Sequence, residues 1–144
     1  MKTPVPVIIV CEDDIHLLSF LVGTLKDTLG KHQIIPVMNG QEALAEITRI
    51  SSSPEQELML VITDIDMPGI DGITLTKQIQ SEHPTLPIII MSGNLISLRY
   101  GEELTPFRLL KPFAFNDFML MIYTALAVGH SGPKATPSLE NVQG

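Results

Sequence analysis

The chain has 144 residues, of which 44% are hydrophobic and 17% charged, a composition typical of one folded domain rather than a disordered chain. The formal net charge of −7 argues against nucleic acid as a direct partner, because phosphate binding needs clustered Lys and Arg, whereas acids suit a divalent cation. Cys11 is the single cysteine, which excludes an internal disulfide, and the apolar run Val5–Cys11 is too short for a signal peptide or a membrane span. We therefore expect a cytoplasmic protein that binds neither nucleic acid directly nor a membrane.

Short apolar runs alternate with amphipathic segments along the chain, a pattern that predicts strands alternating with helices. In chain order we expect a strand at Val5–Cys11, a helix from Asp14 to Leu29, a strand at Gln33–Met38, a helix from Asn39 to Ile50, a strand at Leu58–Thr63, a helix from Gly72 to Glu82, a strand at Leu86–Met91, a short helical signal within 94–104, a strand at Phe107–Leu110 and a helix from Phe113 to about Val128. Five such units predict an α/β fold, with a doubly wound five-stranded parallel sheet and helices on both faces.

Local signals refine these elements. Pro36 shifts the second strand toward a sheet edge, because proline cannot donate a ladder hydrogen bond. Asn39 and Glu42 form the pattern of a capping box, and Asp71 is expected to cap the third helix. Residues 129–144 lack apolar periodicity and carry Gly, Pro and Ser, so we expect a folded domain over 1–128 and a flexible tail or linker over 129–144.

Polar residues follow four of the expected strands. They are Glu12-Asp13-Asp14 after the first strand, Asp64 after the third, Ser92 after the fourth and Lys111 after the fifth. The carboxyl ends of parallel strands share one edge of the sheet, so these side chains should meet there. Acids held together repel one another unless a cation lies among them, and hard oxygen ligands suit Mg²⁺. An aspartate nucleophile, a metal, a lysine and a hydroxyl together make a phosphoryl-accepting site.

Each of these features has a plainer explanation when it is taken alone. Three consecutive acids more often begin a helix, and Asp14 fits that role. Asp64 alone could cap a turn, and Ser92-Gly93 alone is only a junction between a strand and a turn. The functional interpretation depends on their order, because each falls at the end of a different strand.

The same residues resemble the receiver domain of two-component response regulators, of the chemotaxis-regulator kind, over roughly residues 5–128. The resemblance is carried by Glu12-Asp13, Asp64, Met67-Pro68-Gly69, Asp71-Gly72, Ser92-Gly93 and Lys111-Pro112-Phe113. It implies a flavodoxin-like strand order 2-1-3-4-5, which chemotaxis regulators share. It also implies a cis bond between Lys111 and Pro112.

The resemblance assigns a role to each site residue. Asp64 would accept the phosphoryl group, Ser92 would bind a phosphoryl oxygen and Lys111 would pair with the phosphoryl group. Mg²⁺ would be held by Glu12, Asp13, Asp64 and the main-chain carbonyl of Asp66. The implied partners are a sensor histidine kinase or a histidine phosphotransfer protein, with self-association on phosphorylation as a further expectation. Such a domain catalyses only its own phosphorylation and dephosphorylation.

Two features depart from the family pattern. Arg108 stands three residues before Lys111, where the family usually has an aromatic that changes rotamer on activation. Phe107 is one residue off and should point to the other face of the strand. The interval from Ser92 to Lys111 is also short, which predicts a truncated fourth helix ending near Gly101. We therefore expect phosphorylation to act through Ser92 and the loop that follows it.

Two other classes of protein remain as alternatives. Asp64-Ile-Asp66 resembles the Asp-x-Asp of haloacid-dehalogenase-type phosphatases, but those have this motif near the N-terminus and their second acid pair last. A pseudo-receiver would keep the fold as a binding module without phosphorylation. The acid pair, Ser92 and Lys111 argue against it.

Overall fold

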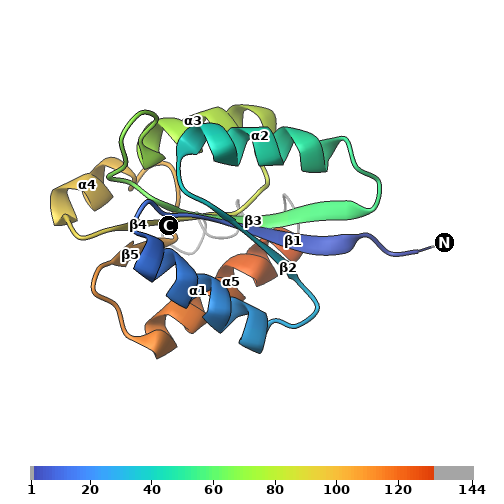
Figure 1. Ribbon diagram of the computed structural model, residues 1–144. Coiled ribbons are helices and arrows are strands. Elements are labelled where there is room, and N and C mark those ends of the chain that lie inside the picture. The colour runs from blue at the N-terminus through green and yellow to red at the C-terminus, as the bar shows by residue number, and fades with distance from the viewer. Residues whose placement is uncertain (1, 132–144) are drawn as a thin grey trace.

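Five short apolar runs form one parallel sheet in the computed structural model, which describes residues 2–131 (Figure 1). The strands are β1 (Val5–Cys11), β2 (Gln33–Val37), β3 (Gln56–Asp64), β4 (Ile88–Ser92) and β5 (Arg108–Leu110). Their order is β2-β1-β3-β4-β5 and all four pairings are parallel, which confirms the predicted fold class and strand order. Pro36 lies in the edge strand β2, as expected.

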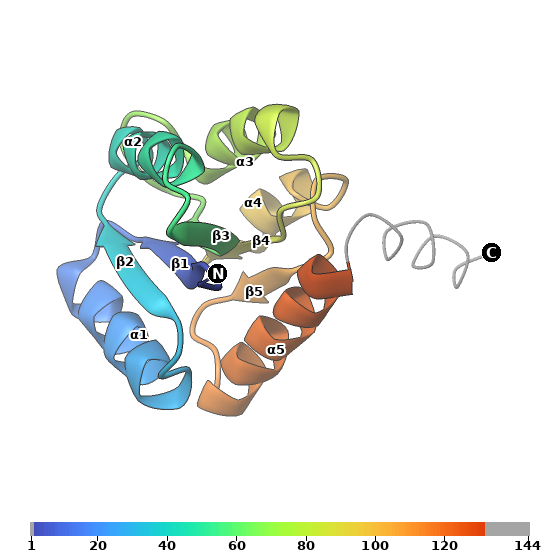
Figure 2. The same cartoon turned by 90° about the vertical axis from the view of Figure 1, so that its right-hand side faces the viewer.

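Helices cover both faces of the sheet, as the alternating pattern predicts. They are α1 (Ile15–Thr28), α2 (Gly40–Ser51), α3 (Gly72–Glu82), α4 (Leu95–Tyr100) and α5 (Phe115–Ser131). Figures 1 and 2 show α1 and α5 on one face and α2, α3 and α4 on the other. Leu21, Leu25 and Phe118 belong to the apolar core under α1 and α5, and Ile47 and Leu75 to the core on the opposite face. In residues 2–131, no helix combines the length and apolar character needed to cross a membrane.

Helix caps define where several helices begin. The Asp14 side chain accepts from the main-chain N–H of His16, and Asp71 caps α3 through Thr74, as predicted. The Asn39 carboxamide accepts from the N–H of Glu42, as in the predicted capping box. The Glu42 carboxylate, however, accepts from the N–H of Met38 and not from that of the cap residue, so the reciprocal half of the box differs from the prediction.

Element boundaries differ from the prediction by one to three residues at several ends. β3 begins at Gln56, before the apolar run, because Gln56 pairs in register with Val5 of β1. β4 begins only at Ile88, after Pro87, whose nitrogen cannot donate to a ladder. The last helix extends beyond Val128 to Ser131. Residues 132–144 of the predicted tail lie outside the described residues.

The short fourth helix agrees with the prediction. α4 has six residues and ends at Tyr100, with Gly101 as its cap residue. A Cβ on Gly101 would collide with Cδ1 of Ile90, so close packing against β4 favours glycine there. The low helix propensity of glycine also favours the end of the helix at this point.

Phe107 directly precedes β5, and Arg108 is the first residue of that strand. Phe107 is buried in the core under α1 and α5, and strand alternation directs Arg108 to the other side. Arg108 is half-buried, and its Nε is buried without a hydrogen-bond partner among residues 2–131. The arginine is therefore only partly exposed to solvent.

Candidate functional site

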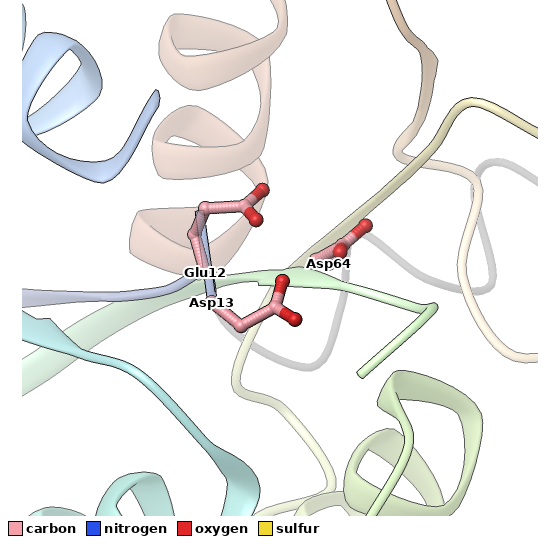
Figure 3. Close-up of side chains that lie close together, drawn as sticks. All are labelled: Glu12, Asp13 and Asp64. Carbon is pink, nitrogen blue, oxygen red and sulfur yellow. The ribbon is translucent and has the colours of Figure 1, made fainter. Parts of the chain in front are cut away.

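Three carboxylates meet where β1 and β3 end side by side. Glu12 and Asp13 directly follow β1, Asp64 ends β3, and Cys11 lies in register with Thr63. One oxygen from each carboxylate lies within 4.8 Å of one from each of the others (Figure 3). Glu12 is 1% exposed and Asp64 4% exposed, whereas Asp13 is exposed. This acidic cluster, referred to below as the acidic pocket, thus combines two buried acids with one that is exposed to solvent.

The main chain after Asp64 is held by neighbouring elements. The N–H of Ile65 donates to the carbonyl of Met91 over 2.8 Å, and the N–H of Gly72 donates to the carbonyl of Ile65 over 2.9 Å. A Cβ on Gly72 would lie 2.7 Å from the Cα of Ile65 and would collide with the carbonyl oxygen of Asp64. Only glycine allows α3 to begin this close to the end of β3, and that packing fixes the position of Asp64.

Lys111 brings a positive charge into the pocket. Its Nζ lies 2.6 Å from Oε1 of Glu12 and 3.1 Å from Oδ1 of Asp64. The main-chain N–H of Lys111 donates to the carbonyl of Ser92, so the end of β4 positions the lysine. The bond between Lys111 and Pro112 is cis, which confirms the expectation from the family resemblance.

Burial, followed by the negative charge of Glu12, raises the pKa of Asp64 to about 6 against the opposing effect of Lys111. Burial lowers the pKa of Lys111, but its hydrogen bond to Glu12 and the charges of Asp64 and Glu12 more than offset this, and the net pKa lies above the ordinary value. Lys111 is therefore a permanent cation beside a carboxylate that is costly to ionise.

The acidic pocket has the donor chemistry that hard divalent cations prefer. Three carboxylates face one lysine among the described residues, so the pocket keeps an excess of negative charge. Mg²⁺ favours a small number of carboxylates together with waters, and the exposed side at Asp13 leaves room for them. Glu12, Asp13 and Asp64 are therefore the residues that fit a divalent cation.

Ser92 ends β4 at the same edge of the sheet and is fully buried. Its Oγ donates to Oδ2 of Asp66 over 2.5 Å and accepts from the main-chain N–H of Asn94. Asp66 also accepts, through Oδ1, from the Oγ of Ser97 over 3.2 Å. The family resemblance implied a role only for the main-chain carbonyl of Asp66, and nothing in the sequence pattern pointed to this use of its side chain.

The sequence matches the response regulator receiver domain family over residues 8–122. The chain belongs to the response-regulator receiver family. This receiver domain is 28% identical over 135 residues to the transcriptional regulatory protein ZraR of Escherichia coli K12, covering 92% of the chain and 29% of ZraR. It is 45% identical over 56 residues to the DNA-binding transcriptional regulator NtrC of Salmonella typhimurium, covering 39% of the chain and 11% of NtrC. It thus spans less than a third of these relatives.

Solved receiver structures have the same fold. The signal receiver domain of an HD domain-containing protein from Pseudomonas fluorescens Pf-5 aligns with a TM-score of 0.77 at 22% identity, covering 91% of this receiver domain and 93% of that chain. The response regulator TrrA from Thermotoga maritima, in complex with Mg²⁺–BeF, aligns with a TM-score of 0.68 at 22% identity, covering 83% and 98%. At this identity, the likeness establishes the fold alone.

Proposed function

We propose that this receiver domain accepts a phosphoryl group on Asp64 from a histidine kinase or a histidine phosphotransfer protein. The observation that carries the proposal is the position of Asp64. It is buried at the carboxyl edge of the sheet, 3.1 Å from the ammonium of Lys111 and beside Glu12 and Asp13. A receiver family member with this set of side chains has the parts needed for phosphoryl transfer.

In the proposed reaction, a carboxylate oxygen of Asp64 forms a bond to phosphorus while the bond from phosphorus to the donor imidazole nitrogen breaks. The imidazole leaves with the electron pair of that bond. Ionised Asp64 is the nucleophile, so its pKa of about 6 leaves it mainly competent at neutral pH. Lys111 stabilises the charge on the transferred group, and Ser92 donates a hydrogen bond to one of its oxygens.

Mg²⁺ is the metal that we propose for the pocket. Glu12, Asp13 and Asp64 would hold it through their carboxylates and Asp66 through its main-chain carbonyl. When bound, it supplies positive charge that offsets the charge of the phosphoryl group. The TrrA structure, which contains Mg²⁺–BeF, supports this choice by analogy.

Intact mass after incubation with acetyl phosphate and Mg²⁺ tests the proposal. The wild-type chain should gain one phosphoryl group, and Asp64→Asn should gain none. Asp71→Asn is a matched control, because Asp71 lies on the same loop but caps α3. An adduct of equal yield on Asp64→Asn would overturn the assignment, and labelling that survives a chelator would overturn the metal requirement.

The same labelling separates the alternatives. A pseudo-receiver would remain unlabelled, and a haloacid-dehalogenase-type phosphatase would turn over a phosphomonoester many times. We expect neither result, and we propose a signalling role without turnover of an external substrate.

Self-association on phosphorylation forms part of the proposal. On α5, Leu120 is 67% exposed and Tyr123 50% exposed, which leaves apolar surface open to a second copy. Sedimentation with and without beryllium fluoride should show a heavier species only in its presence, and Leu120→Ser should abolish the shift. A sedimentation profile that beryllium fluoride leaves unchanged would contradict the proposed self-association.

A further inference from the structure

A single carboxylate ties three segments of the chain together beside the phosphoryl site. Asp66 lies in the turn after β3 and accepts from Ser92 at the end of β4 and from Ser97 in the first turn of α4. The donors are 26 and 31 residues away in sequence. Hydrogen bonds to a charged acceptor are stronger than neutral ones, particularly when the donor is buried as Ser92 is.

The Ser92 hydroxyl has only one proton to donate. In this structure that proton points to Asp66, while the Oγ accepts from the N–H of Asn94. The proposed function requires the same hydroxyl to donate to a phosphoryl oxygen on Asp64. The two acceptors therefore compete for one donor, and Ser92 must leave Asp66 in order to bind the phosphoryl group.

Charge also favours the exchange. A phosphoryl group brings about two negative charges to Asp64, which carries one as a carboxylate. Asp66 is two residues away and already raises the pKa of Asp64 through its charge, although burial and Glu12 act more strongly. Because Asp66 is exposed, its carboxylate can turn to water once Ser92 is lost.

The effect of this exchange would reach α4. This helix has six residues, and Leu98 is its one buried residue. The Ser97–Asp66 bond is thus an important restraint on its first turn, in addition to the cap supplied by Asn94. When Asp66 moves, Ser97 loses its acceptor.

We propose that the Asp66 side chain is a positioning residue that holds the Ser92 hydroxyl away from Asp64 until phosphorylation, and that the phosphoryl group releases α4 by taking this hydroxyl from Asp66. The proposal rests on the proposed function of Asp64. It assigns to Asp66 a role separate from that of its main-chain carbonyl.

A double-mutant cycle tests the competition for Ser92. Affinity for beryllium fluoride in the presence of Mg²⁺ is measured by NMR titration or calorimetry for wild type, Asp66→Ala, Ser92→Ala and the double variant. Losing a competing charge-assisted hydrogen bond should tighten binding in Asp66→Ala by about three- to tenfold. In the Ser92→Ala background, Asp66→Ala should have a much smaller effect, because the competed donor is absent.

Two controls separate charge from hydrogen bonding. Asp66→Asn removes the charge but keeps an acceptor, so its affinity should lie between those of wild type and Asp66→Ala. Glu103→Ala removes an exposed acid from the loop after α4 and should leave the affinity nearly unchanged. If Asp66→Ala changes the affinity equally in the wild-type and Ser92→Ala backgrounds, the change is a through-space charge effect and the proposal is overturned. The proposal is also overturned if Asp66→Ala leaves the affinity unchanged.

Amide hydrogen exchange tests the link to α4 without any phosphoryl group. In the free protein, Asp66→Ala and Ser97→Ala should both speed exchange of the amides within 94–100, and beryllium fluoride should speed them in wild type. Unchanged exchange in both variants would overturn the link. If wild type takes up neither beryllium fluoride nor a phosphoryl group, the proposed function fails, and so does the transfer of the Ser92 hydrogen bond from Asp66 to the phosphoryl group. Faster amide exchange in the two variants would still establish the Asp66–Ser97 restraint.

Discussion

Replacing Asp64 with Asn should stabilise the folded chain at neutral pH when divalent cations are absent. Burial raises the pKa of Asp64 to about 6 from its ordinary value of 3.8, so the ionised carboxylate is less favourable in the folded than in the unfolded chain. One pKa unit corresponds to about 1.4 kcal/mol, which puts the upper limit near 3 kcal/mol. The charges of Glu12 and Lys111 act on Asp64 in opposite directions, so the full limit need not be reached. We therefore expect Asp64→Asn to raise the free energy of unfolding by about 1 to 3 kcal/mol.

The pH dependence of this gain follows from the direction of the pKa shift. A raised folded-state pKa means that protonated Asp64 contributes stability that is fully present below pH 3.8 and lost as the pH rises through about 6. Asparagine resembles the protonated acid at every pH. The stability difference between Asp64→Asn and wild type should therefore be largest above pH 6 and fade toward pH 4.

Urea unfolding with a chelator, from about pH 4 to pH 7.5, measures this difference. Asp13→Asn is the matched control, because it removes a charge from the same cluster but an exposed one, and should gain less. Mg²⁺ should narrow the difference, since a ligand that binds the folded wild type better stabilises it selectively. The reasoning is refuted if Asp64→Asn is no more stable than wild type at neutral pH without metal, or if its gain persists unchanged in acid.

Three further changes give distinct expectations in the same unfolding assay. Gly72→Ala should lower the free energy of unfolding by about 3 kcal/mol, because its Cβ meets the main chain of β3, whereas Gly23→Ala has open space on an exposed helix face and should raise it by about 0.5–1 kcal/mol. Equal effects of the two substitutions would contradict the packing argument. Lys111→Met should lower the free energy of unfolding by about 3 kcal/mol without metal, and Mg²⁺ should stabilise this variant more than it stabilises wild type. An unaltered stability would show that the two buried acids need no cation. Arg108→Met should be neutral or stabilising by about 1 kcal/mol, because it removes a buried Nε without a partner among residues 2–131; a clear loss would mean that the guanidinium is well satisfied.

The fold and the acidic pocket could be predicted because their signals are local in sequence. Apolar runs indicate buried parallel strands, and residues directly after such strands must lie at one edge of the sheet. That is enough to bring Glu12, Asp13 and Asp64 together, and Lys111 follows from the fifth strand. The family resemblance added the strand order and the cis bond, which the residue pattern alone does not contain.

Features that depend on the choice between competing partners were not predictable. Glu42 bonds to the N–H of Met38 instead of completing the capping box, since both donors lie within reach of one flexible side chain. The bonds of Asp66 to Ser92 and Ser97 join residues that are distant in sequence, and they depend on side-chain rotamers fixed only once the sheet is assembled. Strand ends shifted for a similar reason, because pairing with a neighbour and not apolar character decides where β3 begins.

Under the proposed function, the route by which a phosphoryl signal leaves the pocket involves both Arg108 and Asp66. An aromatic at position 108 could swing between buried and exposed states, but the guanidinium carries a permanent charge that is costly to bury fully. Arg108 is half-buried, so part of its side chain stays in contact with water. Ser92, by contrast, would have two acceptors for its one proton once Asp64 is phosphorylated as proposed. Asp66, the acceptor that it would leave, is also bonded to Ser97 of α4. A bistable element is what turns a local charge into a change of conformation, and under the proposed function the Ser92–Asp66–Ser97 connection has that property.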